Sequence, residues 1–317
     1  MHFMILAPLM GLGCKSALTG NEGNFQFSYW ADDWFNDFNK PVAVGASLDL
    51  EVRGVGSNSP VDLTVAAFDD PAVLEVSSFD GMNITITGTG EGLALLEVQG
   101  DLDGESLPDS VNMQAKVPEV LLLGHLCDDG EDAAYIVDRD VVVAFEMQME
   151  NTQPVIGYGY YPVELTATSA AVDHDSTSQI WITVSTGDTA ESVTMSSTID
   201  AATLNMEVGL EGEIDDIEDP IAWVIEDIDV GDTNAFFVRP MIEDLVVCQA
   251  GVEMTVESDT PETCTVAETD PEAEDEAEDG WFAVTGVSEG TCLYTVSYPG
   301  GADGDGVSVQ FSYPIEP

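Results

Sequence analysis

Apolar and polar residues alternate one by one along short stretches of this chain, and no other feature constrains its fold as much. In one such stretch the apolar side chains share one parity: Val42, Val44, Leu48, Leu50 and Val52. Because successive side chains of a strand point to opposite faces, each stretch predicts a β-strand with one face toward a core. Gly, Pro, Asn and Asp separate the stretches, and no window shows a sustained helical stripe with caps. The sequence therefore predicts an all-β fold.

Two copies of one pattern stand 102 residues apart in the chain. Residues 60–64 read Pro-Val-Asp-Leu-Thr, and residues 162–166 read Pro-Val-Glu-Leu-Thr. Downstream of each, residues 83–91 and 179–188 alternate in polarity and then turn at a Gly-acid pair. Self-similarity of this kind indicates that the chain repeats one structural unit.

A third copy matches the first at three points. Residues 44–52 pair with 230–238, residues 71–76 with 261–266, and residues 88–92 with 286–290. The offset between the copies grows from 186 to 190 to 198 residues, as loop insertions would make it. The acidic run 270–279 falls inside the last increase, so we expect it to form a loop.

Short strands at regular spacing with Gly and Pro turns favour tandem antiparallel β-sandwiches. Residues 70–98, with a strand before the Gly-Glu-Gly turn at 90–92 and an Ala- and Leu-rich strand after it, resemble bacterial immunoglobulin-like (Big-type) domains. The resemblance is good in 42–117, fair in 228–313 and weak in 118–212. It implies immunoglobulin-like sandwiches, which we place at 25–117, at 118–212 as a divergent copy, and at 213–317 with the acidic loop 270–279.

The first fourteen residues form a mostly apolar stretch that ends at Cys14, and Gly13 precedes this cysteine. They resemble the end of a bacterial lipoprotein signal peptide, which implies cleavage before Cys14 and a lipid on its thiol. Lys15 follows, and by the same resemblance it implies sorting to the outer membrane, with residues 15–24 as a linker. Two features depart from the pattern, because Gly11 stands where the family prefers Leu and no Lys or Arg precedes Cys14. An ordinary secretory signal and an apolar N-terminal strand are the alternatives.

The chain has five cysteines, and four remain if Cys14 carries a lipid. An even number fits an oxidising compartment, and four cysteines allow three pairings. We favour a bridge between Cys264 and Cys292, whose strands would face each other across the third sandwich, which leaves Cys127 with Cys248. Free buried thiols are the alternative. No Cys-x-x-Cys pair is present, so a zinc site is not expected.

Acidic residues outnumber basic ones by 61 to 6, which gives a formal net charge of −55. Such a chain repels phosphates and anionic lipid, so we expect neither nucleic-acid partners nor any membrane contact besides a lipid anchor. A large acid excess with few lysines is typical of proteins from salt-loving organisms. Because salt screens self-repulsion, we expect folding stability to rise with NaCl or with millimolar Ca²⁺.

Three candidate catalytic features are weak. Residues 286–290 match the Gly-x-Ser-x-Gly nucleophile elbow, but no histidine follows Ser288, and the first copy has Gly90 at that place. His174 lies between two aspartates in a stretch expected to be a solvated loop, and His125 is expected to be a half-buried strand residue. The sequence therefore predicts no catalytic residue.

Ligand sites are equally sparse. Acidic clusters at 128–132, 211–219, 270–279 and 303–306 lack the Asp-x-Asp-x-Asp-Gly spacing of a calcium loop, so we assign no metal site and no cofactor, and consider only weakly bound Ca²⁺. Trp30, Trp34 and Phe35 are the candidate residues for a carbohydrate or partner patch. Packing of this segment on the first sandwich is the alternative.

These observations favour a non-enzymatic cell-envelope protein, held by a lipid anchor as an outer-membrane lipoprotein. It would act as a surface adhesion, scaffold or spacer module, with an envelope protein or a glycan as its partner. A carbohydrate- or calcium-binding surface module is the second hypothesis. A secreted hydrolase is the least favoured, because no pair of carboxylates and no Ser–His pair stands out.

Overall fold

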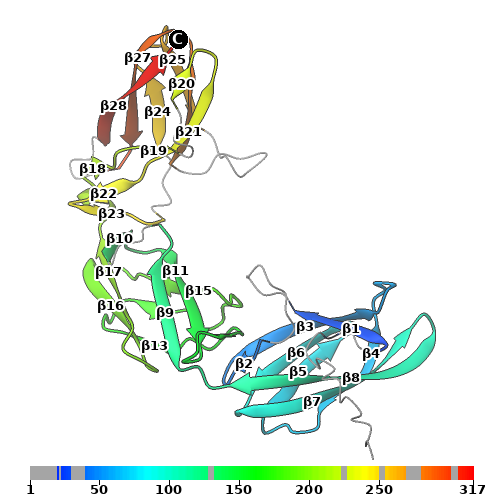
Figure 1. Ribbon diagram of the computed structural model, residues 1–317. Helices are drawn as coiled ribbons and strands as arrows, with labels where there is room; N and C mark the ends of the chain where they lie inside the picture. The colour runs from blue at the N-terminus through cyan, green and yellow to red at the C-terminus, as the bar shows by residue number, and fades with distance from the viewer. Residues whose placement is uncertain are drawn as a thin grey trace, which may run out of the picture. The chain divides into compact units, whose positions relative to one another are not determined.

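Strands make up nearly all the regular structure of the protein (Figure 1). A computed structural model describes residues 20, 23–29, 40–127, 132–222, 227–249, 254–268, 280–300 and 306–317. Within these ranges the only helical element is the short 3-10 turn η1 (Glu211–Glu213), and none of them contains a helix long and apolar enough to cross a membrane. The predicted all-β class with antiparallel sheets is confirmed.

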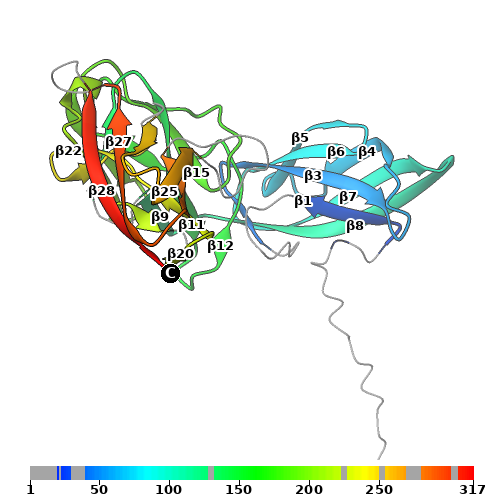
Figure 2. The same cartoon turned by 90° about the horizontal axis from the view of Figure 1, so that it is seen from above.

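The first series of strands forms two four-stranded sheets. Its strands are β1 (Phe25–Tyr29), β2 (Val42–Ala43), β3 (Ser47–Gly54), β4 (Asp62–Phe68), β5 (Leu74–Asp80), β6 (Asn83–Gly88), β7 (Gly92–Leu102) and β8 (Glu105–Lys116). The orders are β1-β3-β6-β5 and β2-β8-β7-β4, with every pair antiparallel except β2 with β8. Strands of both sheets run along a common direction (Figure 2). This is the immunoglobulin order A-B-E-D and A′-G-F-C, with the first strand divided between the sheets.

The second series repeats that order. Its strands are β9 (Val120–His125), β10 (Asp132–Ile136), β11 (Asp140–Gln148), β12 (Pro154–Val155), β13 (Val163–Leu165), β14 (Ala171–Val172), β15 (Trp181–Ser185), β16 (Glu191–Ser197) and β17 (Thr203–Gly209). One sheet has the order β10-β17-β16-β13, and β10 runs parallel to β17. The other has the order β12-β11-β15-β14, with β9 also paired to β11.

The third series repeats the order again and adds a small sheet. Its strands are β18 (Asp216–Ile217), β19 (Ile221–Ala222), β20 (Ile228–Asp229), β21 (Thr233–Phe237), β22 (Pro240–Ile242), β23 (Leu245–Val246), β24 (Thr255–Ser258), β25 (Cys264–Glu268), β26 (Trp281–Gly286), β27 (Gly290–Tyr298) and β28 (Val307–Glu316). The main sheets are β19-β21-β26-β25 and β20-β28-β27-β24, and the small one is β18-β22-β23.

The sequence repeats fall on equivalent strands of the three series. Residues 60–64 and 162–166 lead into β4 and β13, and residues 71–76 and 261–266 lead into β5 and β25. The glycine-bounded segments 88–92 and 286–290 are the turns from β6 to β7 and from β26 to β27. The acidic run 270–279 lies between β25 and β26 and outside the described residues.

Alternating residues build the cores, as the sequence pattern predicts. In the first series, Leu48, Leu50 and Ile84 are at most 1% exposed. Burial of one such side chain contributes roughly 1.5–3 kcal/mol to folding. In the third series, Phe236 and Phe282 stack with ring centroids 5.6 Å apart. The outer positions of β3 hold the polar residues Asp49, Glu51 and Arg53. In β21 and β26 the outer positions include Phe237 and Trp281, whose ring centroids lie 5.0 Å apart.

The chain divides into two compact units. The first comprises Met1–Leu122, Phe145–Pro162 and His174–Ile180, so it holds the first series and parts of the second. The second comprises Leu123–Ala144, Val163–Asp173 and Trp181–Pro317. The domain boundaries expected at 117/118 and 212/213 stay a prediction.

Candidate functional site

Within the first compact unit, residues 41–49 contact residues 155–160, a region we name the first junction. Main-chain hydrogen bonds hold it: the Ala43 amide donates to the Ile156 carbonyl at 2.8 Å. Ser47 and Tyr158 exchange two further main-chain bonds, at 2.9 and 2.8 Å. The first junction is therefore built as a piece of β-ladder rather than as a loose linker.

Two side-chain features complete the first junction. The Tyr158 hydroxyl donates to a carboxylate oxygen of Asp49 at 3.0 Å, and burial together with this bond raises the pKa of Tyr158 to about 12. Gly45 adopts φ +97°, and a Cβ there would lie 2.9 Å from the Tyr160 ring. Only glycine meets both demands at low cost.

Within the second compact unit, Cys127, Ala134 and Val142 of the second series meet residues 247–249, a region we name the second junction. A disulfide joins Cys127 to Cys248, with Cα atoms 5.5 Å apart. The Cys248 amide donates to the Ala134 carbonyl at 2.8 Å. The Gln249 side-chain amide bonds both the amide and the carbonyl of Val142, at 2.9 and 2.7 Å. This junction is covalent as well as hydrogen-bonded.

A second disulfide joins Cys264 on β25 to Cys292 on β27, and so connects the two sheets of the third series. Both cysteines are fully buried, and the closed loop spans 28 residues. The two disulfides in the structure are thus the pairs that the sequence favoured. The role of Gln249 was not predicted, because no motif marks a side chain that bonds a distant backbone.

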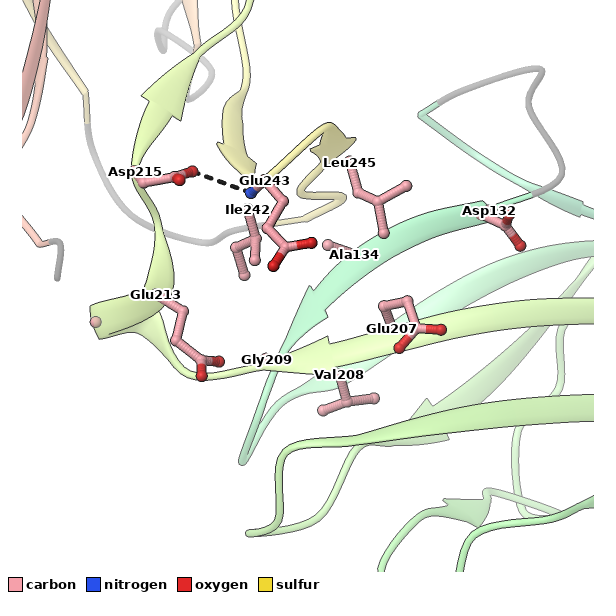
Figure 3. A pocket seen from close by; sticks show the side chains of 11 residues that line it. Asp132, Ala134, Glu207, Val208, Gly209, Glu213, Asp215, Ile242, Glu243 and Leu245 are labelled. Carbon is pink, nitrogen blue, oxygen red and sulfur yellow. Dashed lines mark hydrogen bonds between the residues drawn. The ribbon is translucent and has the colours of Figure 1, made fainter.

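An acidic hollow of about 680 Å³ lies beside the second junction (Figure 3). Strands β10 and β17, the turn η1 and the β22–β23 hairpin form its walls. Its acidic lining residues are Asp132, Glu207, Glu213, Asp215 and Glu243. Ala134, Val208, Ile242 and Leu245 supply apolar surface. The lining therefore combines concentrated negative charge with a small apolar area.

Contacts within the chain engage four of these carboxylates. Asp215 accepts the Glu243 amide at 3.0 Å, and Glu213 accepts the Leu210 amide at 2.8 Å. Asp132 accepts the side-chain amide of Asn205 at 3.1 Å. The Ser192 hydroxyl donates to Glu207. These bonds fix the carboxylates on separate walls of the hollow.

The chemistry open to this hollow is attraction of cations. Its described lining contains no Lys, Arg, His, Ser or Cys, so the five carboxylates have no counter-charge among the described lining residues. Among the residues that the structure describes, no three acidic, His or Cys side chains converge as metal ligands do. The negative charge of the described lining can therefore attract a diffuse cloud of cations.

Several predicted site residues lie outside the described residues: Cys14, Trp30, Trp34, Phe35, and the acidic residues of 128–131, 270–279 and 303–305. The lipid anchor, the aromatic patch and weak calcium binding there stay predictions. The fourth acidic cluster, 211–219, is described and forms η1 and β18.

The weak catalytic candidates occupy structural positions. Ser288 lies in the turn between β26 and β27, and its hydroxyl donates to the Glu262 carbonyl at 2.8 Å. A nucleophile elbow needs a strand-to-helix turn, so this serine is a turn residue, as expected. His174 is exposed, with its ring centroid 6.1 Å from that of Tyr161.

His125 lies on β9 and is 8% exposed, so the prediction that it is half-buried was wrong. Its Nδ1 lies 2.8 Å from the Tyr135 hydroxyl, because β9 and β10 bring the two rings together.

Comparisons with known proteins give structural similarity only. No protein-family model and no curated protein matches the sequence. Domains 4–9 of the surface-layer protein SbsC align over 92% of this chain and 47% of theirs, at 15% identity and TM-score 0.28. The Escherichia coli adhesin FdeC aligns over 95% of this chain and 98% of its own, at 13% identity and TM-score 0.25. An endo-fucoidan hydrolase of glycoside hydrolase family 107 aligns over 87% of this chain and 43% of its own, at 12% identity and TM-score 0.24. This chain thus spans about half the length of the SbsC structure. Its immunoglobulin-like fold is assigned from strand order alone.

Proposed function

We propose that this chain is a non-enzymatic spacer or scaffold of the cell envelope that bears mechanical load, anchored by a lipid on Cys14. The Cys127–Cys248 disulfide carries the proposal, since it closes a loop of 121 residues. Strands β10 to β17 all lie inside that loop. Tension along the chain would therefore pass from β9 through the disulfide, and β10 to β17 would not be pulled apart.

Three further features support a role outside the cytoplasm without chemistry of its own. Disulfides persist mainly in oxidising compartments, and this chain has two. The net charge of −55 keeps such a surface soluble and away from nucleic acid. The described lining of the acidic hollow contains no Ser, Cys, His, Lys or Arg. An envelope protein or a glycan is the proposed partner, and a carbohydrate- or calcium-binding role is the alternative.

Single-molecule stretching of the full chain tests the load-bearing role. With disulfides intact, the loop from Cys127 to Cys248 should stay closed and hide about 121 × 3.5 Å, or roughly 420 Å, of extension. Reductant opens both disulfides of the wild type and should release this length plus about 100 Å from the 28-residue loop of Cys264–Cys292, or roughly 520 Å in all. The matched control is the double variant Cys264→Ser and Cys292→Ser, which should already be about 100 Å longer without reductant and should release only the remaining length of about 420 Å when reductant is added. Equal contour lengths with and without reductant would contradict the proposal.

Fractionation of producing cells tests the envelope location. The wild-type chain should appear in the membrane fraction with a mature N-terminal peptide whose mass includes acyl chains on Cys14. The variant Cys14→Ser should lose both the mass increment and the membrane association. Recovery of unmodified wild-type protein from the cytosol would contradict the location.

A further inference from the structure

The last strand of each series occupies the same place in the fold but differs at its outer edge. These strands are β8, β17 and β28, and each has its antiparallel hairpin partner on one side. The other side of each strand is the edge of its sheet unless a further strand covers it. An uncovered edge presents unpaired amide and carbonyl groups that can pair with another chain.

Two of the three edges are protected. Strand β10 pairs with β17 along five residues, from Asp132 with Asn205 to Ile136 with Gly209. Strand β8 is covered by β2 at its last two residues only, but Glu105, Pro108 and Asp109 stand along the remainder. Charges and proline are the usual means by which proteins prevent edge-to-edge pairing.

Over residues 307–313 the edge of β28 has neither protection, and its one proline, Pro314, lies next to the two residues that β20 covers. Strand β20 pairs with it only at Ile315 and Glu316. From Val307 to Ser312, no backbone group in the described part of the chain bonds this edge, and β18, which approaches β28, pairs instead with β22. The segment from Val307 to Ile315 contains no charged residue, although 21% of the chain is charged. The lack of charge therefore sets this edge apart from that of β8.

The side chains of β28 define two faces. Ser308, Gln310 and Ser312 are exposed on the solvent face. Val307, Val309 and Phe311 are partly buried and pack against the core of the third series. Gln310 donates to Asp259, which also accepts the Thr295 hydroxyl of β27, so this carboxylate lies over β27 rather than beyond the open edge. A strand added at the edge would thus find an apolar face and an uncharged polar face.

We propose that the edge of β28 pairs with the same edge of a second copy of this chain. In an antiparallel pair centred on Val309, Val307 would lie opposite Phe311 and Ser308 opposite Gln310. Apolar then meets apolar and polar meets polar, so the segment is self-complementary. A basic partner would instead be recruited by carboxylates along the edge, and this segment has none. Lack of charge is what two strongly acidic copies need at their contact.

Salt should control this association. Two chains with a net charge of −55 each repel one another at low ionic strength, even where the contact itself is neutral. The Debye length falls to about 3 Å at 1 M salt, so the long-range repulsion disappears there while backbone hydrogen bonds persist. The expected behaviour is a monomer at low salt and a dimer at molar salt.

Analytical ultracentrifugation of the full chain, from about 0.1 to 2 M NaCl, tests the proposal. The wild-type chain should dimerise as salt rises. The double variant Ser308→Glu and Gln310→Glu would place like charges opposite each other twice, and should weaken dimerisation about tenfold or more. The control is Ser106→Glu with Ser110→Glu on β8, which adds the same charge elsewhere and should dimerise like the wild type.

Hydrogen exchange gives a second readout that does not depend on the variants. Amides of residues 307–312 should gain protection at high salt and high protein concentration, but not at high salt and low concentration. A wild-type chain that stays monomeric at every salt concentration would overturn the proposal. The proposal would also be overturned if the β28 double variant and the β8 double variant dimerised equally. A loss of dimerisation in the β8 double variant alone would overturn it as well.

Discussion

The two junctions join immunoglobulin-like series of the same strand order, yet they are held by different chemistry. The first junction depends on main-chain hydrogen bonds, a glycine at positive φ and the Tyr158–Asp49 bond. The second adds the Cys127–Cys248 disulfide to its hydrogen bonds. We therefore expect small changes in side-chain size to destabilise the first junction, whereas the second junction should be destabilised mainly by reduction of its disulfide.

The composition limits how many ion pairs the described residues of either junction can form. Only six basic residues face 61 acidic ones. Three ion pairs among the described residues, Arg53–Glu51, Lys116–Glu91 and Arg239–Glu218, each join residues of a single series. Backbone hydrogen bonds and disulfides need no counter-charge, so they can join acidic segments of a chain that has few cations.

Removing the disulfide of the second junction should give the largest effect. The double variant Cys127→Ser and Cys248→Ser should lose about 5 kcal/mol of unfolding free energy, because the 121-residue loop no longer restricts the unfolded chain. Denaturant unfolding measures this loss. The matched variant without Cys264 and Cys292 should lose less, about 3.5 kcal/mol, because its loop has 28 residues. A larger loss in the second variant would show that local packing outweighs loop length.

Two equivalent glycines separate the contribution of the first junction from backbone strain. Gly45 and Gly231 both follow the first strand of a main sheet, at φ +97° and +98°. A Cβ on Gly45 would press on Tyr160, whereas one on Gly231 would meet nothing within 4 Å. Both Ala variants should lose about 1 kcal/mol to strain, and Gly45→Ala should lose roughly 1–2 kcal/mol more. Thermal melts measure the difference, and equal losses would show that the Tyr160 contact yields freely.

The sequence predicted the strands better than their connections. Alternation at Leu48 and Leu50 marks a buried face directly, and the repeats at 60–64 and 162–166 fall on equivalent strands, because period-2 patterning is a local property. The first junction could not be predicted, since its bonds join backbone atoms more than one hundred residues apart. Gln249 left no signal for the same reason. Four cysteines after Cys14 allow three pairings, and the expectation that Cys264 and Cys292 lie on facing strands of one sandwich chose among them. The dependence of folding stability on salt stays a prediction.

The smallest expected effect is at Tyr158. Its pKa of about 12 lies above the value of about 10 for an unfolded tyrosine, so the neutral phenol is favoured in the folded state. Its contribution to stability is therefore complete below pH 10 and is lost as pH rises toward 12. Tyr158→Phe should lose about 0.5 kcal/mol at neutral pH, because the bond to Asp49 is exposed.

Urea unfolding at pH 8, 10 and 11 measures the difference between this variant and the wild type, which removes the titration of the other tyrosines from the comparison. The gap between the two proteins should narrow as pH rises, because ionised Tyr158 would face the Asp49 carboxylate. Tyr161→Phe is the control, since its hydroxyl donates to the carbonyls of Ser176 and Ser178 rather than to a carboxylate. A gap that stays constant to pH 11 would mean that the Tyr158–Asp49 bond does not stabilise the first junction, and the main-chain ladder alone would then hold it.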